Sequence, residues 1–345
     1  MAKKLTVVVS QGQSANPAKR ELEEAIVAAL LFEPGIEVTV VPNLYDLKAD
    51  STGMLCLSGV AGDMVVASWL YPRAAHWILD RNGVRGRVGP TLLDEPADED
   101  DDAEDESDNA EAKPRVIDER PLPNRTIFCL DLRQHADTGV YIEEIKRIAA
   151  SSQTKVVELG DWSGGTNGAP PASSGNGHAT NGAPQAEAVR IAEQPTRRWY
   201  PVIDYSRCTN CMECIDFCLF GVYGVDSMET ILVEQADNCR KGCPACSRVC
   251  PENAIIFPQH KAPAIAGSDD VEAGGLKIDL SKLFGGDAGE SPEEAAARER
   301  DEQLVLAGRA PVQAASETPK RQPARDDRPK DELDSLIDQL DELDI

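Results

Sequence analysis

The stretches CTNCMECIDFC at residues 208–218 and CRKGCPACSRVCP at residues 239–251 decide the fold of the region around them. The first has the spacing C-x2-C-x2-C-x3-C, and the second has C-x3-C-x2-C-x3-C followed at once by proline. Each stretch lies between short apolar segments, so the two form an internal repeat. Together they hold eight of the ten cysteines of the chain: Cys208, Cys211, Cys214, Cys218, Cys239, Cys243, Cys246 and Cys250.

Cysteines at these spacings indicate iron-sulfur chemistry. A cubane cluster has four irons that each take one thiolate, and a tight loop of three cysteines suits three corners of one cube. The fourth cysteine of each run, three residues further on, is expected at the start of a helix. Structural zinc sites use four ligands, typically as two separated pairs. Disulfides are rare in the reducing cytoplasm that we expect for this chain. We therefore predict bound clusters.

The eight cysteines and Pro251 resemble the bacterial-type two-[4Fe-4S] ferredoxin domain, over about residues 196–262 of the 345 in the chain. The resemblance implies a small α+β fold, with two short hairpins packed on two short helices, and electron transfer as the role. It also implies two crossed ligand sets. Cluster 1 would take Cys208, Cys211, Cys214 and Cys250, and cluster 2 would take Cys239, Cys243, Cys246 and Cys218.

Two positions depart from the family pattern. Leu219 stands where the family usually has a proline after the fourth cysteine. The second run has three residues between Cys239 and Cys243 instead of two, and we expect Gly242 to take up the extra residue as a small bulge. Whether this second site holds [4Fe-4S] or [3Fe-4S] stays open.

Residues 1–160 have the alternating pattern of an α/β domain. Strands are expected at 5–9, 36–41, 55–57, 126–132 and 155–159. Helices are expected after Asn16-Pro17, where Leu22, Ile26 and Leu30 repeat at helical spacing, and at 64–79 and 139–150. This order predicts an open, mostly parallel sheet of about five strands that is Rossmann- or flavodoxin-like.

The remaining segments have the composition of disordered chain. An acidic insertion is expected at 94–115, because twelve of the eighteen residues from Asp94 to Glu111 are acidic. A flexible linker rich in Gly, Ala, Ser and Asn is expected at 161–195 and a disordered tail at 263–329. The last segment, 330–345, has leucines on one helical face and is expected to form an amphipathic helix. Docking of this helix on a partner protein and docking on the protein's own surface, or fraying, are equal alternatives.

Two loops of the N-terminal domain are candidates for binding the phosphate of a flavin or nucleotide. Ser10-Gln-Gly-Gln-Ser14 follows the first expected strand, and Gly59-Val-Ala-Gly62-Asp63 lies between an expected strand and helix. Neither matches a dinucleotide loop or a P-loop. Cys56 and Cys129 have apolar neighbours and are expected to be inert core residues. The four histidines form no spacing motif.

The net charge of -25 argues against nucleic-acid binding. No apolar run is long enough to cross a membrane, and the run at 5–9 is too short for a signal peptide, so we expect a cytoplasmic protein. The main hypothesis is an electron carrier or an electron-transfer subunit with redox partner proteins, rather than an enzyme. The alternatives are an oxidoreductase whose N-terminal domain binds a flavin or nucleotide, and a redox-sensing interaction protein.

Overall fold

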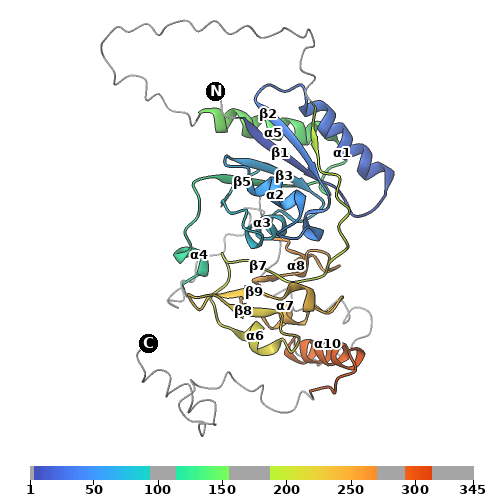
Figure 1. Ribbon diagram of the computed structural model, residues 1–345, viewed down its shortest axis with the longest axis vertical. Helices are drawn as coiled ribbons and strands as arrows, with labels where there is room; N and C mark the ends of the chain where they lie inside the picture. Colours follow the sequence, from blue (N-terminus) through green and yellow to red (C-terminus); the bar gives the residue numbers. More distant parts are fainter. Residues whose placement is uncertain (1–3, 94–113, 155–186, 270–291, 313–345) are drawn as a thin grey trace, which may run out of the picture.

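A computed structural model of the protein describes residues 4–93, 114–154, 187–269 and 292–312. The N-terminal domain alternates strands and helices in layers (Figure 1). Its elements are β1 (Leu5–Ser10), α1 (Pro17–Leu30), β2 (Ile36–Val41), the 3-10 turn η1 (Leu44–Asp46), α2 (Thr52–Ser58), β3 (Met64–Ser68), α3 (Pro72–Arg81), β4 (Arg87–Val88), α4 (Val116–Glu119), β5 (Thr126–Asp131), α5 (Thr138–Thr154) and β6 (Val189–Arg190).

These strands form a six-stranded sheet in the order β4-β5-β3-β1-β2-β6. Every pairing within it is parallel. The predicted α/β domain with a parallel sheet is therefore confirmed. Helices α1 and α5 cover one face of the sheet, and α2 and α3 cover the other (Figure 1). A strand buried on both faces reads as a continuous apolar run, which explains the sequence of β1. Along β1, Val7 and Val9 face the core under α1, while Val8 faces the opposite core.

The sequence interpretation was wrong between residues 52 and 81. Residues 55–57 belong to α2 rather than to a strand, and Ser51 caps this helix by accepting the Met54 N–H at 3.3 Å. Met64–Ser68 is the strand β3, and the helix begins only at Pro72. The β-branched run suits a strand, and proline favours the first turn of a helix over its interior.

Two boundaries also differ from the predicted domains. Val189–Arg190, placed in the predicted linker, pairs with β2 at the edge of the sheet. The strand predicted at 155–159, the acidic residues 94–113 and the helix predicted at 330–345 lie outside the described residues. Within the described residues, no helix has both the length and the apolar character needed to cross a membrane.

The cysteine-rich part is a smaller α+β unit below the sheet in Figure 1. Strands β8 and β9 form an antiparallel hairpin. The second pair, β7 with β10, joins the two ends of the unit rather than forming the second hairpin that we expected. Its elements are β7 (Val202–Ile203), α6 (Glu213–Phe217), β8 (Tyr223–Val225), β9 (Ile231–Val233), the 3-10 turn η3 (Ala236–Asn238), α7 (Ala245–Val249) and β10 (Ile255–Ile256).

Two helices occur within the tail that was predicted to be disordered. They are α8 (Pro263–Ala266) and α10 (Pro292–Leu306). Helix α10 packs against α7. Its buried side chains are Ala295, Ala296, Arg300 and Leu304. Two alanines and an arginine do not make a recognisable apolar face, so the contact between α10 and α7 could not be predicted from hydrophobic periodicity.

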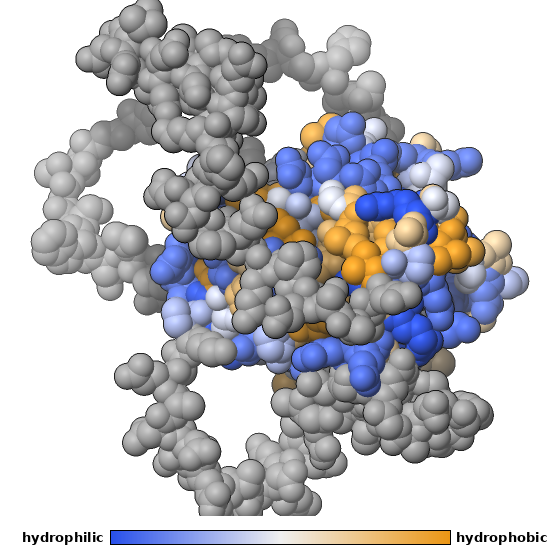
Figure 2. Space-filling view, turned by 90° about the horizontal axis from the view of Figure 1, so that it is seen from below, coloured by the Kyte–Doolittle hydropathy of each residue, from blue (hydrophilic) through white to orange (hydrophobic). Residues whose placement is uncertain are grey.

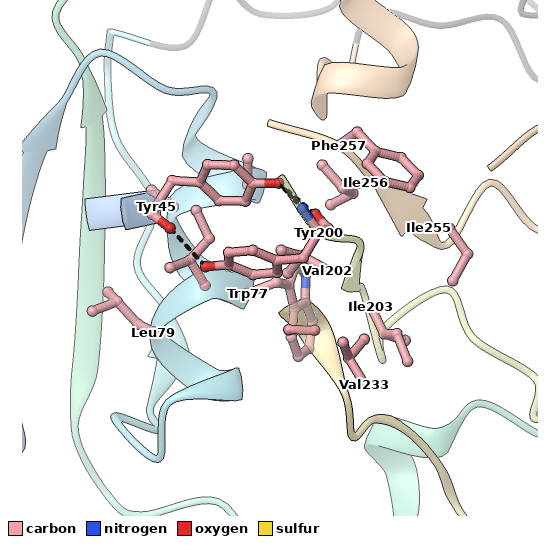
Figure 3. Packing of buried hydrophobic residues seen from close by; sticks show 14 of the residues in the cluster. Tyr45, Trp77, Leu79, Tyr200, Val202, Ile203, Val233, Ile255, Ile256 and Phe257 are labelled. Atoms are coloured by element: carbon pink, nitrogen blue, oxygen red, sulfur yellow. Dashed lines mark hydrogen bonds between the residues drawn. The ribbon is translucent and has the colours of Figure 1, made fainter. Parts of the chain in front are cut away.

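The two units share one continuous hydrophobic core (Figure 3). Tyr45 and Tyr200 stack at 4.3 Å between ring centroids. The Tyr45 hydroxyl donates to the Tyr200 carbonyl at 2.5 Å and accepts the Tyr200 N–H at 2.6 Å. The two units are also joined by Arg73 of α3, which pairs with Asp204 at 2.5 Å, with both side chains buried. The cysteine-rich unit is thus fixed to the helical layer of the N-terminal domain.

Candidate iron-sulfur centre

The structure brings the eight cysteines together as two groups of four, each around its own cavity. The first cavity has an empty volume of about 320 Å³, part of it open to solvent, and Ile231, Ala254 and Ile255 supply apolar walls. Its cysteines come from the first run and from the end of the second, namely Cys208, Cys211, Cys214 and Cys250.

The second cavity has the complementary composition. It too has an empty volume of about 320 Å³, part of it open to solvent. Phe217, Phe220, Val222 and Tyr223 line it, as does Arg300 from α10. Its four cysteines are Cys218, Cys239, Cys243 and Cys246. The two groupings have the same members as the crossed ligand sets implied by the ferredoxin resemblance.

Short helices carry the chain from one cavity to the other. Cys214 lies in α6, and Cys218 ends this helix by donating its N–H to the Cys214 carbonyl at 3.1 Å. Cys246 likewise lies in α7, and Cys250 directly follows the last residue of that helix. At 1.5 Å rise per residue, the four steps between such cysteines advance the chain by about 6 Å. The expectation that the fourth cysteine starts a helix was wrong, because it lies at the end of one.

The loop of the first cavity contains residues in the left-handed conformation, and a side chain of the loop binds it to the β8–β9 hairpin. Asn210 and Met212 both have positive φ, at 58° and 65°. Alternation with the left-handed conformation turns successive N–H groups inward, as in anion-binding nests, and the Asn210 N–H donates to Cys208 Sγ at 3.4 Å. The Asn210 side chain bridges to the β8–β9 hairpin through Glu229 O and Ile231 N, each at 2.9 Å.

The extra residue of the second loop is accommodated in a turn. The Cys243 N–H donates to the Arg240 carbonyl at 3.1 Å, and Gly242 has a φ of 87°. A turn of this kind favours glycine at its third position, because other residues rarely adopt positive φ. Tyr223 reaches into the same site, where its hydroxyl lies 3.1 Å from Cys246 Sγ.

Burial raises the pKa of several of these thiols. The pKa rises to about 11 for Cys208 and to about 11 for Cys243, with burial as the main cause and neighbouring cysteines adding to it. The pKa is also raised, mainly by burial, for Cys214, Cys239, Cys246 and Cys250. Thiols of this kind stay protonated at neutral pH unless a positive charge is bound among them. Loading iron must therefore release protons.

The donor set fits a cubane cluster. Four cysteines line each cavity, most of the other lining residues are apolar, and N–H or O–H groups point at individual sulfurs, as a buried anionic cluster requires. In the described ranges, no three His, Cys, Asp or Glu side chains converge on one point as the ligands of a single ion do. A cubane does not need such convergence, because each iron binds one thiolate at its own corner.

The other candidate residues lie elsewhere. Cys56 is in α2 and Cys129 is buried in β5, and neither lines a cysteine cavity. His76 is buried in α3, His135 and His260 lie in separate loops, and His178 is outside the described residues.

The loop after β1 already holds a carboxylate of its own. Glu23 is buried, and its carboxylate accepts the Gly12 N–H at 2.7 Å and the Trp69 indole N–H at 2.8 Å. Arg20 also pairs with Glu23, at 2.7 Å. These groups occupy the place between β1 and β3 where open α/β sheets usually bind a ligand. Two groups that could bind a phosphate here, the Gly12 N–H and the Arg20 guanidinium, are therefore engaged by Glu23.

The second phosphate-loop candidate lies at the wrong end of the sheet. Gly59–Asp63 connects α2 to the amino end of β3, so no helix begins after it. The Asp63 carboxylate accepts the Thr126 N–H at 2.9 Å and thereby joins two neighbouring strands. Ligands of parallel α/β sheets bind at the carboxyl ends of the strands.

Several residues that support the site were missed by the sequence analysis. Arg73, Asp204 and Arg300 are buried cations or anions that contact partners far along the chain. Their only sequence signal is the position of Asp204 directly after the apolar segment that precedes Cys208.

Comparison with known proteins finds a relative over part of the chain. The chain is 50% identical over 66 residues to an uncharacterised ferredoxin of Methanocaldococcus jannaschii, a match that covers 19% of this chain and 44% of the relative. The chain thus spans less than half of the length of this relative. No family model and no solved structure matches the chain. The chain is therefore similar, over part of its length, to a protein named as a ferredoxin.

Proposed function

We propose that the protein is an electron carrier, or an electron-transfer subunit of a redox complex, that holds two [4Fe-4S] clusters. The observation that carries this proposal is the division of eight cysteines into two cavities of four. The relative named as a ferredoxin supports the same role. Bound in these cavities, the clusters would supply one-electron redox chemistry. The apolar lining residues would shield them from much of the bulk water, and α6 and α7 would connect the two sites.

The first cavity offers the route by which electrons reach the surface. Cys211 is exposed, whereas the second cavity has α10 beside it. An exposed ligand brings its cluster close to a docked partner. We therefore place the contact with the redox partner around Cys211.

The surface around Cys211 is acidic. Glu213 and Asp216 follow it and are exposed. Asp226 and Glu229 are exposed in the β8–β9 turn, to which the Asn210 side chain is bonded. Such a surface attracts a partner with a basic face and speeds its approach.

Apolar side chains accompany these charges. Figure 2 shows the end of the molecule that carries the cysteine-rich unit, where hydrophobic residues gather in the middle of the described surface and hydrophilic ones surround them. Exposed hydrophobic residues in the elements of this end are Val225, Met228, Val305 and Leu306. An apolar centre with a charged rim is common in protein interfaces.

The central test is the metal content of the protein purified or reconstituted without oxygen. About eight irons and eight sulfides per chain are expected, with an EPR spectrum of two interacting reduced clusters after dithionite. Cys214→Ser should lose the first cluster, whereas Cys129→Ser, in the β5 core, should retain both. Zinc in place of iron, or no metal at all, would show that the proposal is wrong.

The docking surface can be tested with a basic cytochrome c as electron acceptor. The rate of its reduction should fall as salt is added, because salt screens attraction between exposed charges. Replacing Glu213 and Glu229 together by Gln should slow the reaction at low salt, while Glu37→Gln, in the exposed part of β2, should not. Equal effects of the two changes would place the contact elsewhere.

A further inference from the structure

Helix α10 brings a buried arginine to the second cysteine cavity. Arg300 is 5% exposed, although arginine is almost never buried without partners. It lines the cavity together with Cys218, Cys239, Cys243 and Cys246. Neither the cysteine spacing nor the ferredoxin resemblance accounts for this residue, because α10 lies outside the cysteine-rich segment.

Several contacts hold the guanidinium group in place. Its central carbon lies 4.8 Å from the centre of the Phe217 ring, next to Cys218 in the chain. Its Nε donates to the Asp301 carboxylate at 3.1 Å, and one Nη donates to the Val312 carbonyl at 3.2 Å. Asp301 offsets part of the positive charge. The Arg300 guanidinium therefore places a cation at the wall of the cavity.

A fixed cation acts differently on the two oxidation states of a cluster. Reduction adds one negative charge, and the Coulomb energy of that charge with a nearby guanidinium is favourable and weakly screened in a buried site. The reduced state is therefore stabilised, and the reduction potential rises. The electron comes from the redox partner, and neither a bond nor a proton has to move.

We propose that Arg300 of α10 is a tuning residue that raises the reduction potential of the cluster held by Cys218, Cys239, Cys243 and Cys246. This proposal rests on the proposed function.

Glu299, the neighbour of Arg300, tests whether the reduction potential of the second cluster depends on the sign of the nearby charge. It pairs with Arg248 of α7 at 2.9 Å, where the Glu299 side chain is 23% exposed, and the same short helix carries Cys246 of the second cavity. Loss of its negative charge should favour the reduced cluster, whereas loss of the Arg300 charge should oppose it. A purely structural role of α10 would instead move both variants in the same direction.

The experiment is an EPR-monitored redox titration of the full-length, cluster-loaded protein. Arg300→Met removes the charge, Arg300→Lys keeps it, and Glu299→Gln removes the neighbouring anion. Arg298→Met is the matched control, because Arg298 lies on the same helix with its side chain 50% exposed. A Cys211→Ser variant, which lacks an exposed ligand of the first site, identifies the signal of the second site.

Arg300→Met should make reduction of the second cluster at least tenfold less favourable, a shift of 59 mV for one electron. Glu299→Gln should shift the same potential upward, and Arg300→Lys should remain near the wild type. Unchanged potentials in both variants, shifts of one sign, or an equal shift in Arg298→Met would overturn the proposal. If Arg300→Met does not retain its second cluster, Glu299→Gln alone decides. The proposal is refuted if the reduction potential of the second cluster does not rise in Glu299→Gln. Wild-type protein without iron would refute the proposed function instead.

Discussion

Replacing Arg73 by methionine should separate the two units of the protein more than any change of an exposed ion pair. Arg73 belongs to α3 of the N-terminal domain, and Asp204 precedes the first cysteine run, 131 positions further along the chain. Their side chains are 6% and 1% exposed and lie 2.5 Å apart. Arg73 also donates to the Asn253 carbonyl at 2.5 Å. A single buried pair therefore joins α3 to both ends of the cysteine-rich unit.

The expected loss of stability follows from this burial. Methionine fills much of the volume of arginine but leaves the Asp204 carboxylate in the interior without its main partner. Breaking a buried pair by removing one partner typically costs about 3–5 kcal/mol. Asp204 also has Arg207 at 3.7 Å and accepts from the Ser206 hydroxyl at 2.5 Å. We therefore expect a cost near the lower end, roughly 3 kcal/mol.

The assay is anaerobic chemical denaturation of the cluster-loaded protein, followed by the visible absorption of the clusters and by far-UV circular dichroism. Arg190→Met is the matched control. Arg190 pairs with Glu24 at 2.6 Å, but both side chains are 49% exposed, so this change should cost at most about 1 kcal/mol.

A double-mutant cycle decides whether the pair itself is responsible. Arg73→Met together with Asp204→Asn should cost less than the sum of the single changes, with an interaction energy of roughly 2–3 kcal/mol. A cost of Arg73→Met equal to that of Arg190→Met, or strictly additive costs in the cycle, would refute the reasoning. The cysteine-rich unit would then be held to α3 by its apolar contacts alone.

Three further predictions concern single residues. In a urea titration, Gly242→Ala should destabilise the cluster-loaded protein by about 1–2 kcal/mol, because φ is 87° and the new methyl group meets backbone strain but no neighbouring atom. Gly59→Ala, at a φ of -71°, should be nearly neutral in the same titration. Tyr45→Phe leaves the buried N–H and C=O of Tyr200 without the hydroxyl and should cost at least about 2 kcal/mol in thermal unfolding. Burial lowers the pKa of His76 in the folded protein. As the pH falls below about 6.5, the unfolded chain therefore binds a proton before the folded protein does, and the free energy of unfolding decreases. His76→Phe should reduce the fall in melting temperature between about pH 7 and pH 5.

Local patterns in the sequence were sufficient where a residue and its structural partner lie close in the chain. Asn16 and Pro17 start α1 as predicted, because a cap and its helix are only a few residues apart. The strands at 5–9, 36–41 and 126–132 are confirmed, with small shifts in their ends.

The errors arose where short segments were ambiguous. Residues 55–57 and 64–68 are both short and apolar, and periodicity alone does not separate a helix from a strand at that length. The phosphate-loop hypothesis for Gly59–Asp63 depended on that interpretation and failed with it, since the order of helix and strand is reversed.

The sequence by itself predicted iron-sulfur chemistry, because the spacing of the cysteines is a local pattern, and it predicted the α/β class, because buried parallel strands are continuous apolar runs. Only the tertiary structure showed that Val189–Arg190 joins the sheet, that Arg73 meets Asp204 and that Arg300 lines the second cavity. These contacts depend on which surfaces remain to be covered once the local elements have formed. Charged and small residues such as Arg300 and Ala296 carry no local signal of that burial, so only the packed chain reveals it.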